Sequence, residues 1–243
     1  MKSCIRISNN LIVFKSNKVV SKGIDKLKFF DILTKNEMEN NIREEYSFNF
    51  SVNGLTVMTI EGNKEKENYN GNKILLCACK KYIKKQKNGI LLVVIGNKYN
   101  NFSHIFYDTH NFEVYCFCPL FKLEEKKIIE QKIEKSISKY FLVGGFEKEK
   151  NIGAIKLYKL VYKKPNNKIN IMYIQDIIFK DDNSFFKFKM PISSIIQSDK
   201  DGRILITCWD GKVYLFEYLN INYYLQYDDN FNKNTTFNDF FKF

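Results

Sequence analysis

The stretch "DGRILITCWDGKVYLFEY" (residues 201–218) decides how the rest of the chain is interpreted. The apolar run 203–208 and the alternating run 212–218 each have the length and residue types of a β-strand. Between them, Asp210-Gly211 predicts a hairpin, because both residues tolerate the positive φ angles of a type I′ turn. We therefore interpret Trp209-Asp210-Gly211 as a turn, with Trp209 packed on a neighbouring sheet, and not as a catalytic site.

The same pattern of strand, polar loop, glycine and returning strand occurs twice upstream, at 73–95 and 139–162. Gly89 and Gly153 open the returning strands there, as Gly211 does in the first stretch. Further strand-like runs lie at 53–60, 104–108, 112–118, 169–179, 191–197 and 222–228. Such a repeat predicts units that bury their faces against one another.

These units predict an all-β chain, a β-propeller or partial propeller of about three to four four-stranded antiparallel blades. We expect residues 1–52 to hold a partial blade and a connecting segment, 53–228 three blades, and 229–243 a C-terminal tail. Polar insertions at 61–72 and 121–138 interrupt the blades. Apolar residues at a helix-like spacing in the second insertion predict one short helix there.

Residues 191–218 resemble one repeat of the WD-repeat β-propeller family. Asp210-Gly211 matches the Asp-Gly between the second and third strands of that family, and Phe216-Glu217 stands where the family has its terminal Trp-Asp. The Gly-His dipeptide of the family is missing here. The two upstream hairpins are more similar to the large propellers of the cleavage-and-polyadenylation factor and damaged-DNA-binding type. The resemblance implies a propeller fold and supports this fold far better than any function.

The composition limits the class of protein. At 243 residues with 44% hydrophobic and 16% aromatic residues, the chain is too apolar to be disordered. Its net charge of +12 is compatible with an acidic partner or a nucleic acid. The positive charge, however, comes almost entirely from lysine. Arginine, which binds phosphate and guanine better, occurs only at Arg6, Arg43 and Arg203. The candidate basic binding residues lie in one predicted loop: Lys80, Lys81, Tyr82, Lys84, Lys85 and Lys87.

Zinc-type ligands cluster in the middle of the chain: His104, His110, Cys116 and Cys118, with Cys77 and Cys79 as a second Cys-x-Cys. In an apolar strand, however, a Cys-x-Cys directs both sulfurs to one face, where cysteine acts as a small hydrophobe. We favour that interpretation and predict no metal and no cofactor.

The apolar run at the N-terminus is too short for a signal peptide, and no run is long enough for a membrane span. We expect an intracellular protein, cytoplasmic or nuclear and not secreted, without a membrane partner. The sequence contains no phosphate-binding P-loop motif, no glycine-rich dinucleotide-binding motif and no Gly-x-Ser-x-Gly motif of the serine hydrolases. The sequence thus predicts a non-catalytic scaffold in a multi-protein complex, with RNA or DNA binding through the lysine-rich loops as the alternative.

Overall fold

In the computed structural model every regular element that is described is a β-strand, and the all-β prediction is confirmed. The structure describes residues 4–6, 11–17, 25–31, 37–38, 50–60, 73–83, 85–95, 102–127, 136–163, 168–177, 179–181, 184–198, 203–218 and 241–242. No helix that is long and apolar enough to span a membrane occurs in this part of the chain.

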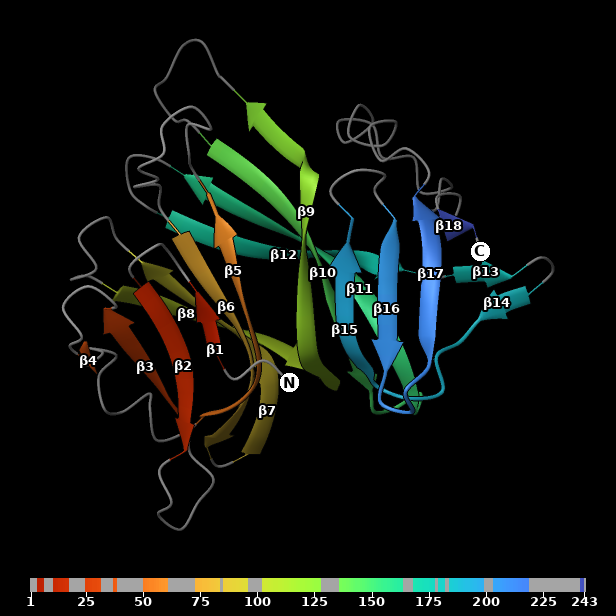
Figure 1. The fold of residues 1–243 in the computed structure, drawn as a ribbon, viewed down its shortest axis with the longest axis horizontal. Helices are drawn as coiled ribbons and strands as arrows, with labels where there is room; N and C mark the ends of the chain where they lie inside the picture. Colours follow the sequence, from red (N-terminus) through yellow and green to blue (C-terminus); the bar gives the residue numbers. More distant parts are fainter. Residues whose placement is uncertain are drawn as a thin grey trace. The chain divides into compact units, whose positions relative to one another are not determined.

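The chain divides into two compact units, residues 1–116 and 117–243. The division falls inside the region 53–228 that the sequence assigns to one set of blades. Unit 1 contains two four-stranded antiparallel sheets whose strands pair in chain order (Figure 1). Their strands are β1 (Cys4–Arg6), β2 (Leu11–Asn17), β3 (Asp25–Asp31), β4 (Glu37–Met38), β5 (Phe50–Thr59), β6 (Lys73–Ile83), β7 (Lys85–Ile95) and β8 (Phe102–His110).

Unit 2 contains two more four-stranded sheets, whose strands again pair in chain order. A short hairpin lies between these two sheets in the sequence. The sheet β9–β12 is formed by β9 (Phe112–Lys127), which begins in unit 1, β10 (Ser136–Glu147), β11 (Ile152–Lys163) and β12 (Lys168–Ile177). The hairpin consists of β13 (Phe179–Asp181) and β14 (Ser184–Phe186). The last sheet is formed by β15 (Ile192–Gln197), β16 (Ile204–Cys208), β17 (Val213–Tyr218) and β18 (Phe241–Lys242).

The three predicted hairpins are present as β6–β7, β10–β11 and β16–β17. The predicted helix at 121–138 is wrong at both ends of that range, because β9 continues to Lys127 and β10 begins at Ser136. Residues 136–138 pair with residues 161–163 of β11, and this pairing satisfies their backbone in place of a helix. Residues 128–135 lie outside the described residues.

The ends of the chain differ in detail from the prediction. Residues 1–52, expected to hold a partial blade, contain the complete four-stranded sheet β1–β4. The fourth strand of the last sheet is β18, which pairs with Glu217 and Tyr218 from within the predicted tail. The predicted strand 222–228 and the insertion 61–72 lie outside the described residues.

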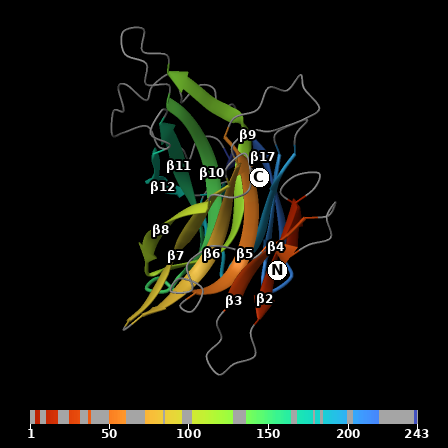
Figure 2. The same cartoon turned by 90° about the vertical axis from the view of Figure 1, so that its left-hand side faces the viewer.

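The core of unit 1 lies on the central strands β6 and β7. Residues 74–79 and 90–93 are almost completely buried, so these strands are apolar on both faces and do not alternate. Figures 1 and 2 show β5, β6, β7 and β8 side by side in one twisted sheet. Gly89 on β7 lies so close to β8 that a Cβ atom would come within 2.4 Å of the Tyr107 carbonyl oxygen, so only glycine fits.

In unit 2, Phe188 connects the two sheets. Its carbonyl accepts a hydrogen bond of 2.8 Å from the Gly153 N–H of β11, at a point that β12 no longer covers. Its buried ring packs edge-on against Tyr214 and Phe216 of β17, at centroid distances of 5.3 and 6.4 Å. One residue therefore extends the sheet β9–β12 and fills the core of the sheet β15–β18.

The hairpin β16–β17 is confirmed, but its predicted type I′ turn is wrong. Only Gly211 has a positive φ, of 79°, whereas a type I′ turn also needs one at Asp210. The Gly211 N–H donates to the Cys208 carbonyl at 3.1 Å, and the Cys208 N–H donates to Lys212 at 3.0 Å. This is a three-residue loop with a glycine bulge. Trp209 is 50% exposed, so its predicted packing on a neighbouring sheet is not confirmed.

Gly153 and Gly211 are required for different reasons, and paired substitutions separate them. A Cβ at Gly153 would lie 2.1 Å from the Met190 carbonyl oxygen, so we expect Gly153→Ala to cost about 1–3 kcal/mol of unfolding free energy. Gly211 has open space around it but a positive φ, so Gly211→Ala should cost about 1–2 kcal/mol.

Asn tolerates a positive φ, so Gly211→Asn should restore most of the loss, whereas Gly153→Asn should not. Urea denaturation of the four variants measures this. An equal recovery of stability by Asn at both positions would contradict the assignment of a steric cause at Gly153 and a conformational cause at Gly211.

Candidate functional site

The predicted basic loop is a regular hairpin and not a loop. Lys80, Lys81 and Tyr82 lie on β6, and Lys85 and Lys87 lie on β7, in a ladder that runs without a break from Lys73↔Ile95 to Ile83↔Lys85. Continuous pairing with β7 keeps these polar residues in the strand. Lys84 lies outside the described residues, and only Lys80 and Lys87 have described side chains.

Lys80 is engaged inside the protein. Its Nζ lies 2.6 Å from Glu113 Oε1, and the Tyr115 hydroxyl donates to Glu113 Oε2 at 2.5 Å. Glu113 and Tyr115 are both buried, so the carboxylate is largely removed from water with both oxygens paired. Burial, followed by the hydrogen bond to Glu113, raises the pKa of Tyr115 well above its ordinary value. This cluster is a structural ion pair.

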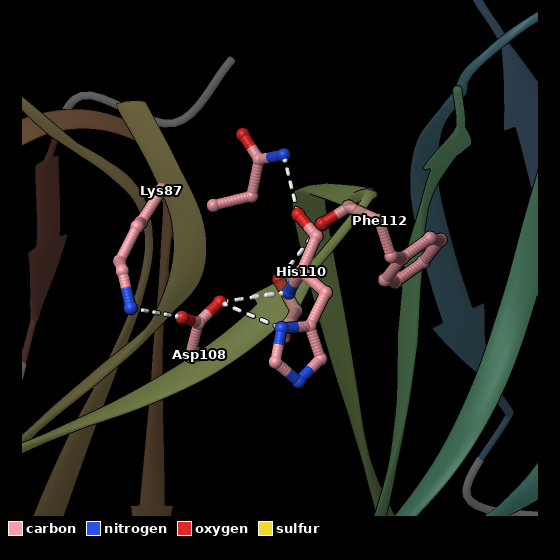
Figure 3. A network of polar contacts seen from close by, with 6 residues as sticks. Lys87, Asp108, His110 and Phe112 are labelled. Atoms are coloured by element: carbon pink, nitrogen blue, oxygen red, sulfur yellow. Dashed lines mark hydrogen bonds and ion pairs between the residues drawn. The ribbon is translucent and has the colours of Figure 1, made fainter. Parts of the chain in front are cut away.

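Lys87 is engaged in a second network near the start of β7 (Figure 3). Its Nζ donates to Asp108 Oδ2 at 2.8 Å, and Asp108 Oδ1 accepts the backbone N–H of His110 at 2.8 Å. Burial alone would raise the pKa of Asp108, but the hydrogen bonds from Lys87 and His110 outweigh it, and the pKa is lowered.

The network around Asp108 shapes the turn that leads into β9. His110 has a φ of 55°, in the left-handed region that non-glycine residues seldom adopt. The Asn88 side chain donates to the His110 carbonyl at 2.9 Å, and Thr109 Oγ1 donates to the Phe112 carbonyl at 2.7 Å. Both side-chain hydrogen bonds stabilise the turn, so this cluster also has a structural role.

The cysteine residues are placed as small apolar side chains. Cys77, Cys79, Cys118 and Cys208 are buried, Cys116 is half-buried, and all five are free thiols. His110 is exposed at its turn, and the side chain of His104 lies outside the described ones. Among the described residues, no group of three or more His, Cys, Asp or Glu is arranged to hold a metal ion.

The most unusual surface among the described residues is the outer face of β15–β17. Ile196, Leu205 and Leu215 lie opposite one another across the three strands, and Thr207 lies opposite Val213 in the next row. Ile196, Val213 and Leu215 are 57%, 59% and 52% exposed. We call these five residues the outer apolar face: four are aliphatic, and the fifth, Thr207, lies within hydrogen-bond distance of Ser193 through its hydroxyl.

Sequence reasoning missed the outer apolar face. The run 212–218 alternates, with Val213, Leu215 and Glu217 on one face and Tyr214, Phe216 and Tyr218 on the other, so both faces are mainly apolar. Only the packing of Phe188 on Tyr214 and Phe216 decides which face is inside. Scattered exposed apolar residues are ordinary, but a row of them across a sheet is a candidate interaction surface.

No protein-family model matches the chain, and none of the curated proteins is significantly similar to it.

The Lys80–Glu113 pair should behave as a buried ion pair. Lys80→Met leaves the buried carboxylate without its cation, and we expect a loss of about 3 kcal/mol in the free energy of unfolding. The double variant Lys80→Met/Glu113→Leu should recover part of this, because it removes the stranded charge. Urea denaturation measures both. Lys150→Met, at an exposed turn position, is the control and should change stability by less than about 0.5 kcal/mol.

A Lys80→Met variant as stable as the control would show that the pair is solvated and Lys80 is available to a partner.

The buried thiols should react slowly. Burial raises the pKa of Cys118 to about 12 and that of Cys208 to about 11, and burial next to Cys79 raises that of Cys77. Since the thiolate is the nucleophile, we expect iodoacetamide at pH 8 to label these three at least about tenfold more slowly in the native protein than in urea. Peptide mass spectrometry measures each site. Native labelling as fast as in urea would contradict the burial of that thiol.

Proposed function

We propose that this chain is a non-catalytic interaction protein of the β-propeller type, and that it joins an intracellular assembly by binding a protein partner. The observation that carries the proposal is the outer apolar face. The four meander sheets support the propeller reading, because successive blades of such proteins are four-stranded antiparallel units. The resemblance of residues 191–218 to a WD repeat points the same way.

The outer apolar face has the chemistry of a protein interface core. The five side chains that define it carry no charge, and cores of protein interfaces are depleted in charge. Burying a Val, Leu or Ile side chain fully is worth about 1.5–3 kcal/mol, so covering Ile196, Val213 and Leu215 would contribute substantially to binding. Trp209, half-exposed at the adjacent turn, is of a residue type enriched among binding hot spots.

The described lysines of the β6–β7 hairpin favour this function over nucleic-acid binding. Lys80 and Lys87, two of the six candidate residues, are neutralised by Glu113 and Asp108. A phosphate backbone would have to compete with these carboxylates. The net charge of +12 instead suits a partner with an acidic surface around an apolar patch.

The test is affinity purification of the tagged chain from its own cells, compared with the variant Val213→Asp/Leu215→Arg, which adds no net charge. We expect a set of co-purifying proteins that survives nuclease and is lost with the variant. Both residues are a little over half exposed, so we expect the variant to stay folded at a cost of about 1 kcal/mol per position, which its thermal midpoint checks.

The matched control is Glu149→Lys/Lys150→Glu at the exposed β10–β11 turn, which also adds no net charge. Partners that persist in the Val213→Asp/Leu215→Arg variant would contradict the proposal. Partners that vanish with nuclease would favour RNA or DNA binding.

A further inference from the structure

Strand β12 forms one end of the sheet β9–β12 and pairs with β11 on one side only, among the residues that the structure describes (Figure 1). From Lys168 to Tyr173 its register with β11 is regular, and a bulge follows. Alternate residues of an end strand direct their N–H and C=O groups away from the sheet, where another strand can pair with them. Six consecutive residues of β12 thus offer a regular edge.

Two lysines stand opposite each other at the start of this edge. Lys163 of β11 pairs in register with Lys168 of β12, which places both side chains on one face of the sheet with Cβ atoms about 5 Å apart. Both are exposed, and neither has an ion-pair partner within the described part of the chain. Like charges directly opposite are destabilising. Lys159, on the same face, lies over the Tyr140 ring at 5.2 Å.

The other face of β12 is apolar. Ile169 and Ile171 are buried, whereas Lys168, Asn170 and Met172 are exposed on the face of the lysines. A strand that pairs with β12 would extend the sheet, and its side chains would lie next to those of β12 on both faces. Acidic side chains would neutralise the lysines on one face, and apolar side chains would extend the row of Ile169 and Ile171 on the other. Since side chains alternate along a strand, the matching sequence alternates acidic and apolar residues.

We propose that β12 binds an extended peptide segment of a partner protein by strand addition, and that this segment alternates acidic and apolar residues. Main-chain hydrogen bonds to the edge of β12 supply affinity, as in other complexes of this kind, and the Lys163–Lys168 pair supplies selectivity. This site is separate from the outer apolar face, which lies on another sheet, so each can fail without the other.

The test uses the full chain and a short fluorescein-labelled synthetic peptide of alternating Glu and Val, followed by fluorescence anisotropy. We expect saturable binding that Lys163→Glu/Lys168→Glu weakens about tenfold or more. The same peptide with N-methyl groups on alternate amides should not bind, because it cannot complete the ladder. Lys148→Glu/Lys150→Glu, at the exposed β10–β11 turn, changes the net charge equally and should leave binding unchanged.

Thermal unfolding separates lost binding from lost folding. Lys163→Glu alone converts the like-charge pair into an attractive one, so its thermal midpoint should rise while its affinity for the peptide falls. No binding of the peptide, or equal binding of the N-methylated peptide, would overturn strand addition. Oligo-dT binding that depends on Lys163 and Lys168, with no peptide binding, would overturn it in favour of nucleic acid.

Discussion

At Gly153 the chain brings a second stretch of backbone against β11 at the point where β12 has ended, and the arrangement of unit 2 depends on this contact. Phe188 accepts the hydrogen bond from Gly153, and two residues later the Met190 carbonyl oxygen occupies the space of a Cβ. The next residue, Pro191, accepts a hydrogen bond from the Trp209 N–H at 3.0 Å. The segment 187–191 therefore fixes the last sheet to the one before it, and it decides that Tyr214 and Phe216 face inward. The exposure of Val213 and Leu215 on the opposite face follows directly.

Local signals in the sequence were sufficient for the three hairpins β6–β7, β10–β11 and β16–β17, but not for β18, which pairs from within the predicted tail. Apolar runs bounded by turn residues identified the hairpins, and Gly89, Gly153 and Gly211 each marked a real constraint, although for two different reasons. The helix predicted at 121–138 is wrong at 121–127 and 136–138, where the chain forms the strands β9 and β10. The type I′ turn is wrong because Asp-Gly also suits a loop in which only the glycine has a positive φ. The candidate site could not be found in this way. Lysines close together in sequence suggested a binding loop, but the partners that neutralise Lys80 and Lys87 come from other strands.

Charge in this chain is used in two ways. Lys80 and Lys87 are paired with carboxylates, and so is Lys156, which lies 2.7 Å from Glu147. Lys163 and Lys168 face each other without a carboxylate among the described residues, at the edge of a sheet. Paired lysines hold neighbouring strands together, whereas an unrelieved pair at an edge lowers stability unless a partner supplies the negative charge. Together with the outer apolar face, this gives the second unit two surfaces of different chemistry, one mainly apolar and one basic.

The central claim is that the outer apolar face is covered when the protein is in its native assembly. Carbene footprinting of the isolated chain and of the assembly purified from its cells tests it most directly, because the label reports the solvent exposure of individual side chains. The account predicts that labelling of Ile196, Val213 and Leu215 falls on assembly, while labelling of the exposed turn at 148–151 does not change. Unchanged labelling of these three side chains, with protection on the β6–β7 hairpin instead, would contradict it.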